Sequence, residues 1–174
     1  MLNTAAAITA SYLLGAIPFA YIAGRLKKGV DIRQVGGGNM GALNTFREIG
    51  LAAGLAVLIA DITKGLVAVL IARWLGLSTV WVLVAGFAAI AGHNWPVFLK
   101  FRGGKGAATT LGVLLGLVPV EAAISLGVIA IIIIITSNVR FAVAIGLMCL
   151  PVIIWQFDGS LTFIIYSLSL ALFS

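Results

Sequence analysis

The chain has 174 residues, of which 62% are hydrophobic and only 9% charged, and its formal net charge is +6. A mean hydropathy of +1.21 excludes the soluble globular class, whose members rarely expose apolar patches beyond about a few hundred Å². The basic residues lie in short gaps between apolar runs and form no solvated face with interleaved aromatics, so no nucleic-acid partner is expected. The composition therefore predicts an integral membrane protein.

Seven apolar runs follow one another along the chain, and a helix needs about 20 residues to cross a bilayer core of about 30 Å. The first run lacks the basic start of a secretory signal and is expected to be a retained span. We expect an all-α, polytopic protein with about seven transmembrane helices in a single domain, 1–174. The expected spans are 3–24, 50–72, 79–99, 106–118, 120–137, 141–157 and 160–174. Of these, 106–118 and 160–174 are short for a full crossing.

Arginine and lysine concentrate in alternate gaps, and short cytoplasmic loops are enriched in these residues. The first, third and fifth gaps hold Arg25, Lys27, Lys28, Arg33, Arg47, Lys100, Arg102, Lys105 and Arg140. With seven spans, this distribution predicts an N-terminus outside, a C-terminus in the cytoplasm and glycine-rich loops on the cytoplasmic side.

Two of these basic gaps contain glycine clusters, "VGGGNMGALN" at 35–44 and "KFRGGKG" at 100–106. Non-helical backbone at membrane depth survives only where protein or a water-filled cavity surrounds it. Bare glycine amides beside a cation and a helix start can cradle a phosphate. We expect such a cradle at Gly36, Gly37, Gly38, Gly41, Gly103, Gly104 and Gly106. The alternative is that the glycines make tight turns or close helix packing.

Three ionisable residues lie within or near the apolar runs. Asp61 and Lys64 in "LIADITKGL" share a helix face, so they form a neutralising pair, or Lys64 reaches an anionic substrate. His93 in "AGHNWPVF" either exchanges protons or bonds a loop carbonyl and fixes the turn before Pro96. One histidine and one cysteine make a metal site improbable.

Four segments carry a resemblance to a known family: "GAIPFAYIAG", "DIRQVGGGNMGALNTFREIG", "DITKG" and "GHNWPVFLKFRGGKGAAT". In this order they resemble the bacterial membrane-embedded acyl-phosphate:glycerol-3-phosphate acyltransferases, from about residue 11 to 112. The resemblance implies a multi-pass protein of the bacterial plasma membrane. It implies transfer of an acyl group from acyl phosphate to the 1-hydroxyl of glycerol 3-phosphate, giving lysophosphatidic acid and phosphate for phospholipid synthesis. Membrane lipids are further partners, no cofactor or metal is implied, and a monomer is expected.

The resemblance also assigns roles to individual residues. It implies a catalytic set of His93, Lys105, Arg47 and Asn39. To the glycines above it adds Asn44, Thr109 and Arg140 as phosphate-binding residues, with Asp61 and Lys64 in support. Phosphates held by cations and donors aimed at the acyl oxyanion would supply positioning and charge stabilisation. The proton of the attacking hydroxyl would go to His93 or to a substrate phosphate.

Several positions depart from the family pattern. Ala16, Gly37 and Leu43 stand where the family usually has Ser, Ser and Thr, and Arg140 and Val143 replace a serine-bearing stretch. The family's basic C-terminal motif is also missing from the sequence. Each lost hydroxyl removes a hydrogen bond worth about 1.5–3 kcal/mol to a charged group. Two functions stay open: an active acyltransferase in which Arg140 replaces a lost phosphate contact, and a catalytically impaired or repurposed paralogue that binds a phosphorylated lipid precursor. A transporter is less favoured, because no internal repeat is found.

Overall fold

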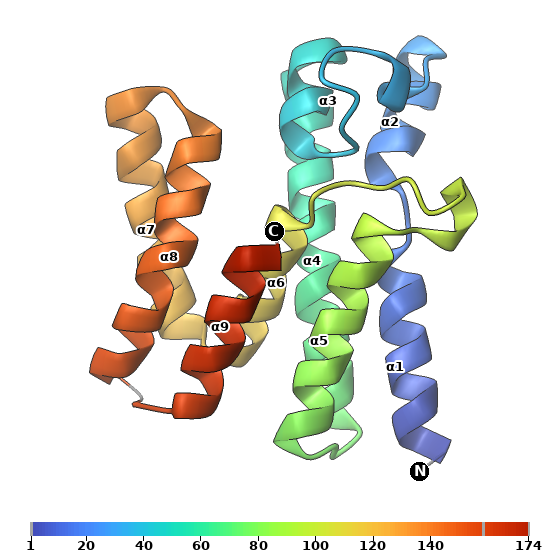
Figure 1. Cartoon of the computed structure of the whole chain (residues 1–174). Helices are drawn as coiled ribbons and strands as arrows, with labels where there is room; N and C mark the ends of the chain where they lie inside the picture. Colours follow the sequence, from blue (N-terminus) through green and yellow to red (C-terminus); the bar gives the residue numbers. More distant parts are fainter. Residues whose placement is uncertain (1, 158, 174) are drawn as a thin grey trace. The chain divides into compact units, whose positions relative to one another are not determined.

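The computed structural model describes residues 2–157 and 159–173, and within these ranges it contains helices and loops but no strand (Figure 1). The expected all-α fold is confirmed. The α-helices are α1 (Leu2–Gly15), α2 (Phe19–Lys28), α3 (Ala42–Glu48), α4 (Leu51–Trp74), α5 (Thr79–Asn94), α6 (Ala107–Leu117), α7 (Pro119–Thr136), α8 (Val139–Phe157) and α9 (Leu161–Phe173). Two short 3₁₀ helices, η1 (Ile32–Gln34) and η2 (Val97–Leu99), lie in the connections.

The chain divides into two compact units, Met1–Val113 and Leu114–Ser174, and the division falls within α6. The single-domain organisation expected from the sequence stays a prediction.

Five stretches of the described residues are long and apolar enough to cross a membrane: Leu2–Lys28, Leu51–Trp74, Thr79–Leu99, Pro119–Thr136 and Val139–Phe157. Helices α6 and α9 are apolar but shorter, as their sequences predicted. Ser174, the last residue of the expected span 160–174, lies outside the described residues. The multi-pass membrane class is thus supported, whereas the count of seven spans and their orientation stay predictions.

The first expected span, 3–24, falls within the apolar stretch Leu2–Lys28, but this stretch is not one continuous helix. Helix α1 ends at Gly15 and α2 begins at Phe19, with Pro18 at the break. Proline has no backbone N–H, and its ring collides with the carbonyl of the preceding helical turn, so it interrupts a helix. Helix α2 then continues to Lys28 and ends at Gly29, whose φ of 68° lies in the left-handed region. The apolar stretch therefore forms two helices with non-helical backbone between them.

In the first unit, α1 packs directly against α5 through glycines, and both helices also contact α4 (Figure 1). A Cβ atom added to Gly15 would overlap the main chain of Ala89, and one added to Gly92 would overlap the main-chain oxygen of Tyr12. The Tyr12 hydroxyl donates a hydrogen bond of 2.8 Å to the carbonyl of Trp95, just beyond α5. Small residues commonly allow such close approach between membrane helices.

In the second unit, α8 packs against both α7 and α9. The Ser125 hydroxyl of α7 donates to the Gly146 carbonyl of α8 over 2.8 Å, which ties the two helices together. Arg140 lies in the first turn of α8 with an exposed side chain. Its expected role in phosphate binding stays a prediction.

Candidate functional site

The two glycine segments meet in the first unit. They line an open cleft of about 670 Å³, to which the first segment contributes Gly38 and the second Gly103. Arg33, just before the first segment, donates a 3.3 Å hydrogen bond from its guanidinium to the carbonyl of Leu99, just before the second. The remaining lining residues are Asp31, Gln34, Phe98, Lys100 and Arg102.

Three cations, Arg33, Lys100 and Arg102, therefore line this cleft. All three belong to the basic gaps of the sequence, where no local pattern marked them as site residues. The Asp31 carboxylate is the one acidic lining side chain in the described part of the chain, so the lining carries a net positive charge. An excess of positive charge favours the binding of phosphate-bearing compounds.

Asp31 holds Arg33 in place at the rim of the cleft. Its carboxylate caps η1 by accepting from the Arg33 amide over 3.0 Å, and it accepts from Arg33 Nη2 over 2.7 Å. The side-chain hydrogen bond from Arg33 lowers the pKa of the Asp31 carboxyl, and the same bond raises the pKa of Arg33. Both groups therefore stay charged at neutral pH. The spacing Asp-x-Arg after a helix end was the available sequence signal for this pair.

Asn44 organises the first glycine segment. Its Oδ1 accepts from the Gly37 amide over 2.9 Å, and its Nδ2 donates to two main-chain carbonyls over 3.2 Å each. The Gly38 amide donates to the Val35 carbonyl, and Gly36 and Gly38 have φ angles of 57° and 66°. We expected bare amides here, whereas the Gly37 and Gly38 amides bond within the protein. The phosphate-binding role of Asn44 stays a prediction.

The second glycine segment folds back onto the end of α5. The Gly103 amide donates to the Asn94 carbonyl and the Gly104 amide to the His93 carbonyl, over 3.1 Å each. These two amides are therefore also occupied, which differs from the expected bare donors. A Cβ atom added to Gly104 would collide with Nε2 of the His93 ring, so this position has no room for a side chain.

The other predicted site residues lie apart from the cleft lining. Arg47 and Lys105 are both exposed, and neither lines the cleft; Asn39 and Gly41 are half-buried. The Thr109 side chain is fully buried, and its hydroxyl has no partner among the described residues. The roles assigned to these residues stay predictions.

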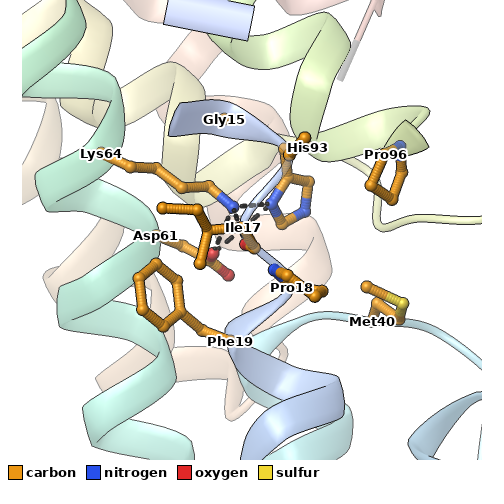
Figure 2. Close-up of a pocket in the computed structure, with 10 residues that line it drawn as sticks. Gly15, Ile17, Pro18, Phe19, Met40, Asp61, Lys64, His93 and Pro96 are labelled. Atoms are coloured by element: carbon orange, nitrogen blue, oxygen red, sulfur yellow. Dashed lines mark hydrogen bonds and ion pairs between the residues drawn. The ribbon is translucent and has the colours of Figure 1, made fainter. Parts of the chain in front are cut away.

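A second cluster lies inside the first unit, where Asp61 and Lys64 of α4 meet His93 of α5 (Figure 2). The three residues are 1%, 3% and 6% exposed. Lys64 Nζ lies 2.8 Å from Asp61 Oδ1, off the direction of a good hydrogen bond, so the attraction is mainly between charges. The predicted neutralising pair is confirmed.

Lys64 also reaches beyond its partner on α4. Its Nζ lies 2.8 Å from His93 Nδ1 and 3.2 Å from the carbonyl of Ile17, in the break between α1 and α2. The surrounding crevice, which Pro18 and Met40 help to line, leaves no space for a water molecule. The lysine thus stabilises backbone that the proline break removes from a helix. Among the described residues, no group of three His, Cys, Asp or Glu side chains is arranged to hold a metal ion.

Comparisons with known proteins agree over most of the chain. A family model described as glycerol-3-phosphate acyltransferase matches residues 5–174. Glycerol-3-phosphate acyltransferase 1 of Dehalococcoides mccartyi (strain 195) is 47% identical over 150 residues, which cover 83% of this chain and 72% of that protein. Glycerol-3-phosphate acyltransferase of Prochlorococcus marinus (strain NATL2A) is 41% identical, over 90% of this chain and 81% of the relative. Two further Dehalococcoides mccartyi relatives are covered over 65% and 64% of their length.

Solved structures give the same result. The crystal structure of PlsY (YgiH), an integral membrane glycerol 3-phosphate acyltransferase, in its glycerol 3-phosphate form matches with a TM-score of 0.91 and 32% identity. The match covers 98% of this chain and 85% of that chain. The lysophosphatidic acid form of the same protein matches with a TM-score of 0.88 and 30% identity, over the same shares.

Proposed function

Because the chain belongs to the glycerol-3-phosphate acyltransferase family, we propose that it is a multi-pass membrane enzyme that acylates glycerol 3-phosphate to lysophosphatidic acid. The donor in this proposal is an acyl phosphate and the acceptor is the 1-hydroxyl group. The hydroxyl oxygen bonds to the acyl carbon, the bond from that carbon to the phosphate oxygen breaks, and inorganic phosphate leaves with the hydroxyl proton. No cofactor takes part in these steps.

The observation that carries the proposal is the cationic cleft between the two glycine segments. Its volume of about 670 Å³ lies within the range of about 300–1,000 Å³ typical of small-molecule sites. Arg33, Lys100 and Arg102 line it together with one carboxylate, so a phosphate dianion compensates the surplus charge. We infer that this cleft receives a phosphorylated substrate at the membrane surface.

Arg47 and Lys105 extend the proposal beyond the cleft lining. Arg47 lies in the last turn of α3, and Lys105 lies in the second glycine segment. Both are exposed, and neither forms an ion pair within residues 2–157 and 159–173. Such side chains can change rotamer to contact a bound phosphate, which fits the roles that the resemblance assigned to them. The proposed functional unit is a monomer.

The test is phosphate release by the purified protein in lipid nanodiscs. Palmitoyl phosphate should yield inorganic phosphate only when glycerol 3-phosphate is present. Tight binding of both substrates without release would favour the paralogue that only binds a phosphorylated lipid precursor. If the protein neither binds the two substrates nor releases phosphate, both hypotheses, the acyltransferase and the binding paralogue, would be refuted.

Two variants locate the phosphate contacts. Arg102→Gln should raise KM for glycerol 3-phosphate, and more so at low ionic strength, because screening weakens attraction between exposed charges. Lys105→Ala should abolish release while the protein stays folded. Lys27→Gln is the matched control, since Lys27 is an exposed cation of α2 away from the cleft lining. Full activity in Lys105→Ala would take Lys105 out of the site.

A further inference from the structure

The Lys64 ammonium group is surrounded by three acceptors. Asp61 Oδ1 and His93 Nδ1 each lie 2.8 Å from Nζ, and the Ile17 carbonyl oxygen lies 3.2 Å away. A lysine ammonium has three hydrogens to donate and no lone pair to accept with. Whatever faces it must therefore present a lone pair, and this requirement includes His93 Nδ1.

The ammonium thereby decides which ring nitrogen of His93 carries the hydrogen. A neutral imidazole has one N–H and one lone pair, and the partner of one nitrogen sets the state of the other. Asp61 Oδ1 lies 3.4 Å from Nδ1 and could accept a hydrogen from it, but the ammonium lies nearer to both atoms. With Nδ1 occupied as an acceptor, the hydrogen is on Nε2.

The Nε2 edge of the ring faces the second glycine segment. A Cβ atom added to Gly104 would meet Nε2 before any other atom. No described residue provides a hydrogen-bond partner for Nε2, whereas Nδ1 points to Lys64 (Figure 2). The free N–H therefore lies beside Gly104, which follows Gly103 of the cleft lining.

We propose that His93 donates its Nε2–H to a substrate oxygen that lies beside the Gly103–Gly104 segment. Asp61 and Lys64 are the positioning residues that fix its ring and tautomer. The oxygen belongs to a phosphoryl group or to the acyl carbonyl, where negative charge grows during transfer. This role in the reaction rests on the proposed function, but the tautomer does not. In this state Nε2 has no lone pair with which to take the hydroxyl proton.

The tautomer can be measured directly, because the chain contains one histidine. Protein with ¹⁵N-labelled histidine in nanodiscs gives a single pair of ring nitrogens, and proton–nitrogen correlation spectra show which of them bears the hydrogen. The wild type should be in the Nε2–H form. A wild-type spectrum of the Nδ1–H form, or of a rapidly exchanging mixture, would overturn the proposal.

Variants then test the positioning residues. Lys64→Met should shift the ring towards the Nδ1–H form, because Asp61 becomes the partner nearest to Nδ1. Lys27→Met removes an exposed lysine from α2 and should leave the spectrum unchanged. If Lys64→Met does not fold, the neutral double variant Asp61→Leu/Lys64→Met serves instead and should lose the pure Nε2–H form. An unchanged tautomer in these variants would refute the role of Lys64.

Kinetics separate a positioning role from general structural support. Lys64→Met should lower kcat by about 10- to 100-fold, the loss expected for a hydrogen bond to a charged group, with little change in KM. His93→Gln keeps a donor near the Nε2 position and should retain more activity than His93→Leu. A shifted tautomer with unchanged kcat would overturn the positioning role alone. An inactive wild type with the Nε2–H form would instead count against the proposed function.

Discussion

Replacing Lys64 by methionine should destabilise the protein chiefly by leaving a carboxylate without its counter-charge. The change removes the hydrogen bonds from Nζ to His93 Nδ1 and to the Ile17 carbonyl. Hydrogen bonds between membrane helices average about 0.6 kcal/mol and reach about 1.7 kcal/mol, so two of them are worth about 1–3 kcal/mol. Breaking a buried ion pair by removing one partner costs about 3–5 kcal/mol. Since Asp61 is only 1% exposed, the charge effect should dominate.

The double variant Asp61→Leu/Lys64→Met separates the two effects. It contains no unpaired charge and loses only the hydrogen bonds, so its free energy of unfolding should lie within about 1–3 kcal/mol of the wild type. The single Lys64→Met variant should lose about 3–5 kcal/mol. Free energies of unfolding measured in mixed micelles of increasing denaturing detergent provide the comparison, with Lys27→Met as a control that should match the wild type.

Two results would refute this reasoning. A double variant as unstable as Lys64→Met would show that the hydrogen bonds, and not the unpaired charge, determine the loss. A loss below about 1 kcal/mol in Lys64→Met would show that the Asp61 carboxylate finds another partner or solvent, against its observed burial.

The remaining predictions concern the glycine segment and the rim of the cleft. Gly104→Ala should abolish phosphate release from palmitoyl phosphate, because the new Cβ meets the His93 ring. Gly127→Ala is the control and should stay active, since open space surrounds Gly127. Equal activity of the two variants would contradict the close approach of Gly104 to His93. The stabilisation from the lowered pKa of Asp31 is present above its ordinary value of 3.8 and is lost as pH falls through the lower folded value. As pH falls, the free energy of unfolding should therefore decrease more steeply in the wild type than in Asp31→Asn. Parallel pH profiles of the two proteins would exclude the Asp31–Arg33 contact as a source of stability.

Hydropathy predicted most of the helices, because a long apolar run in a membrane protein leaves little alternative to a helix. The expected spans 50–72 and 120–137 fall within two or so residues of α4 and α7 at each end, as is usual for helix boundaries. The first span was located correctly, but its break was missed, because hydropathy is continuous across Pro18 and does not show that the proline lacks an N–H. The proline itself was the available signal.

The candidate site was predicted in part, and the missing part depends on tertiary packing. The Asp61–Lys64 pair follows from local spacing, since residues three apart share a helix face. The contact of Lys64 with His93 depends on how α4 and α5 pack, which no local pattern contains. The glycine amides were expected to be bare because the sequence shows glycines but not their neighbours. Asn44 and the carbonyls at the end of α5 already accept hydrogen bonds from several of them.

The glycine contacts between α1 and α5 limit how far the charged cluster can move. Gly15 lies just before the broken backbone that Lys64 stabilises, and Gly92 directly precedes His93. At both positions the main chains of α1 and α5 are in direct contact. The separation between the Ile17 carbonyl and His93 therefore does not depend on any side-chain rotamer. The lipid-facing residues of these helices can therefore change over evolution without altering the alignment of the imidazole, whereas adding one methyl group at either glycine would shift it.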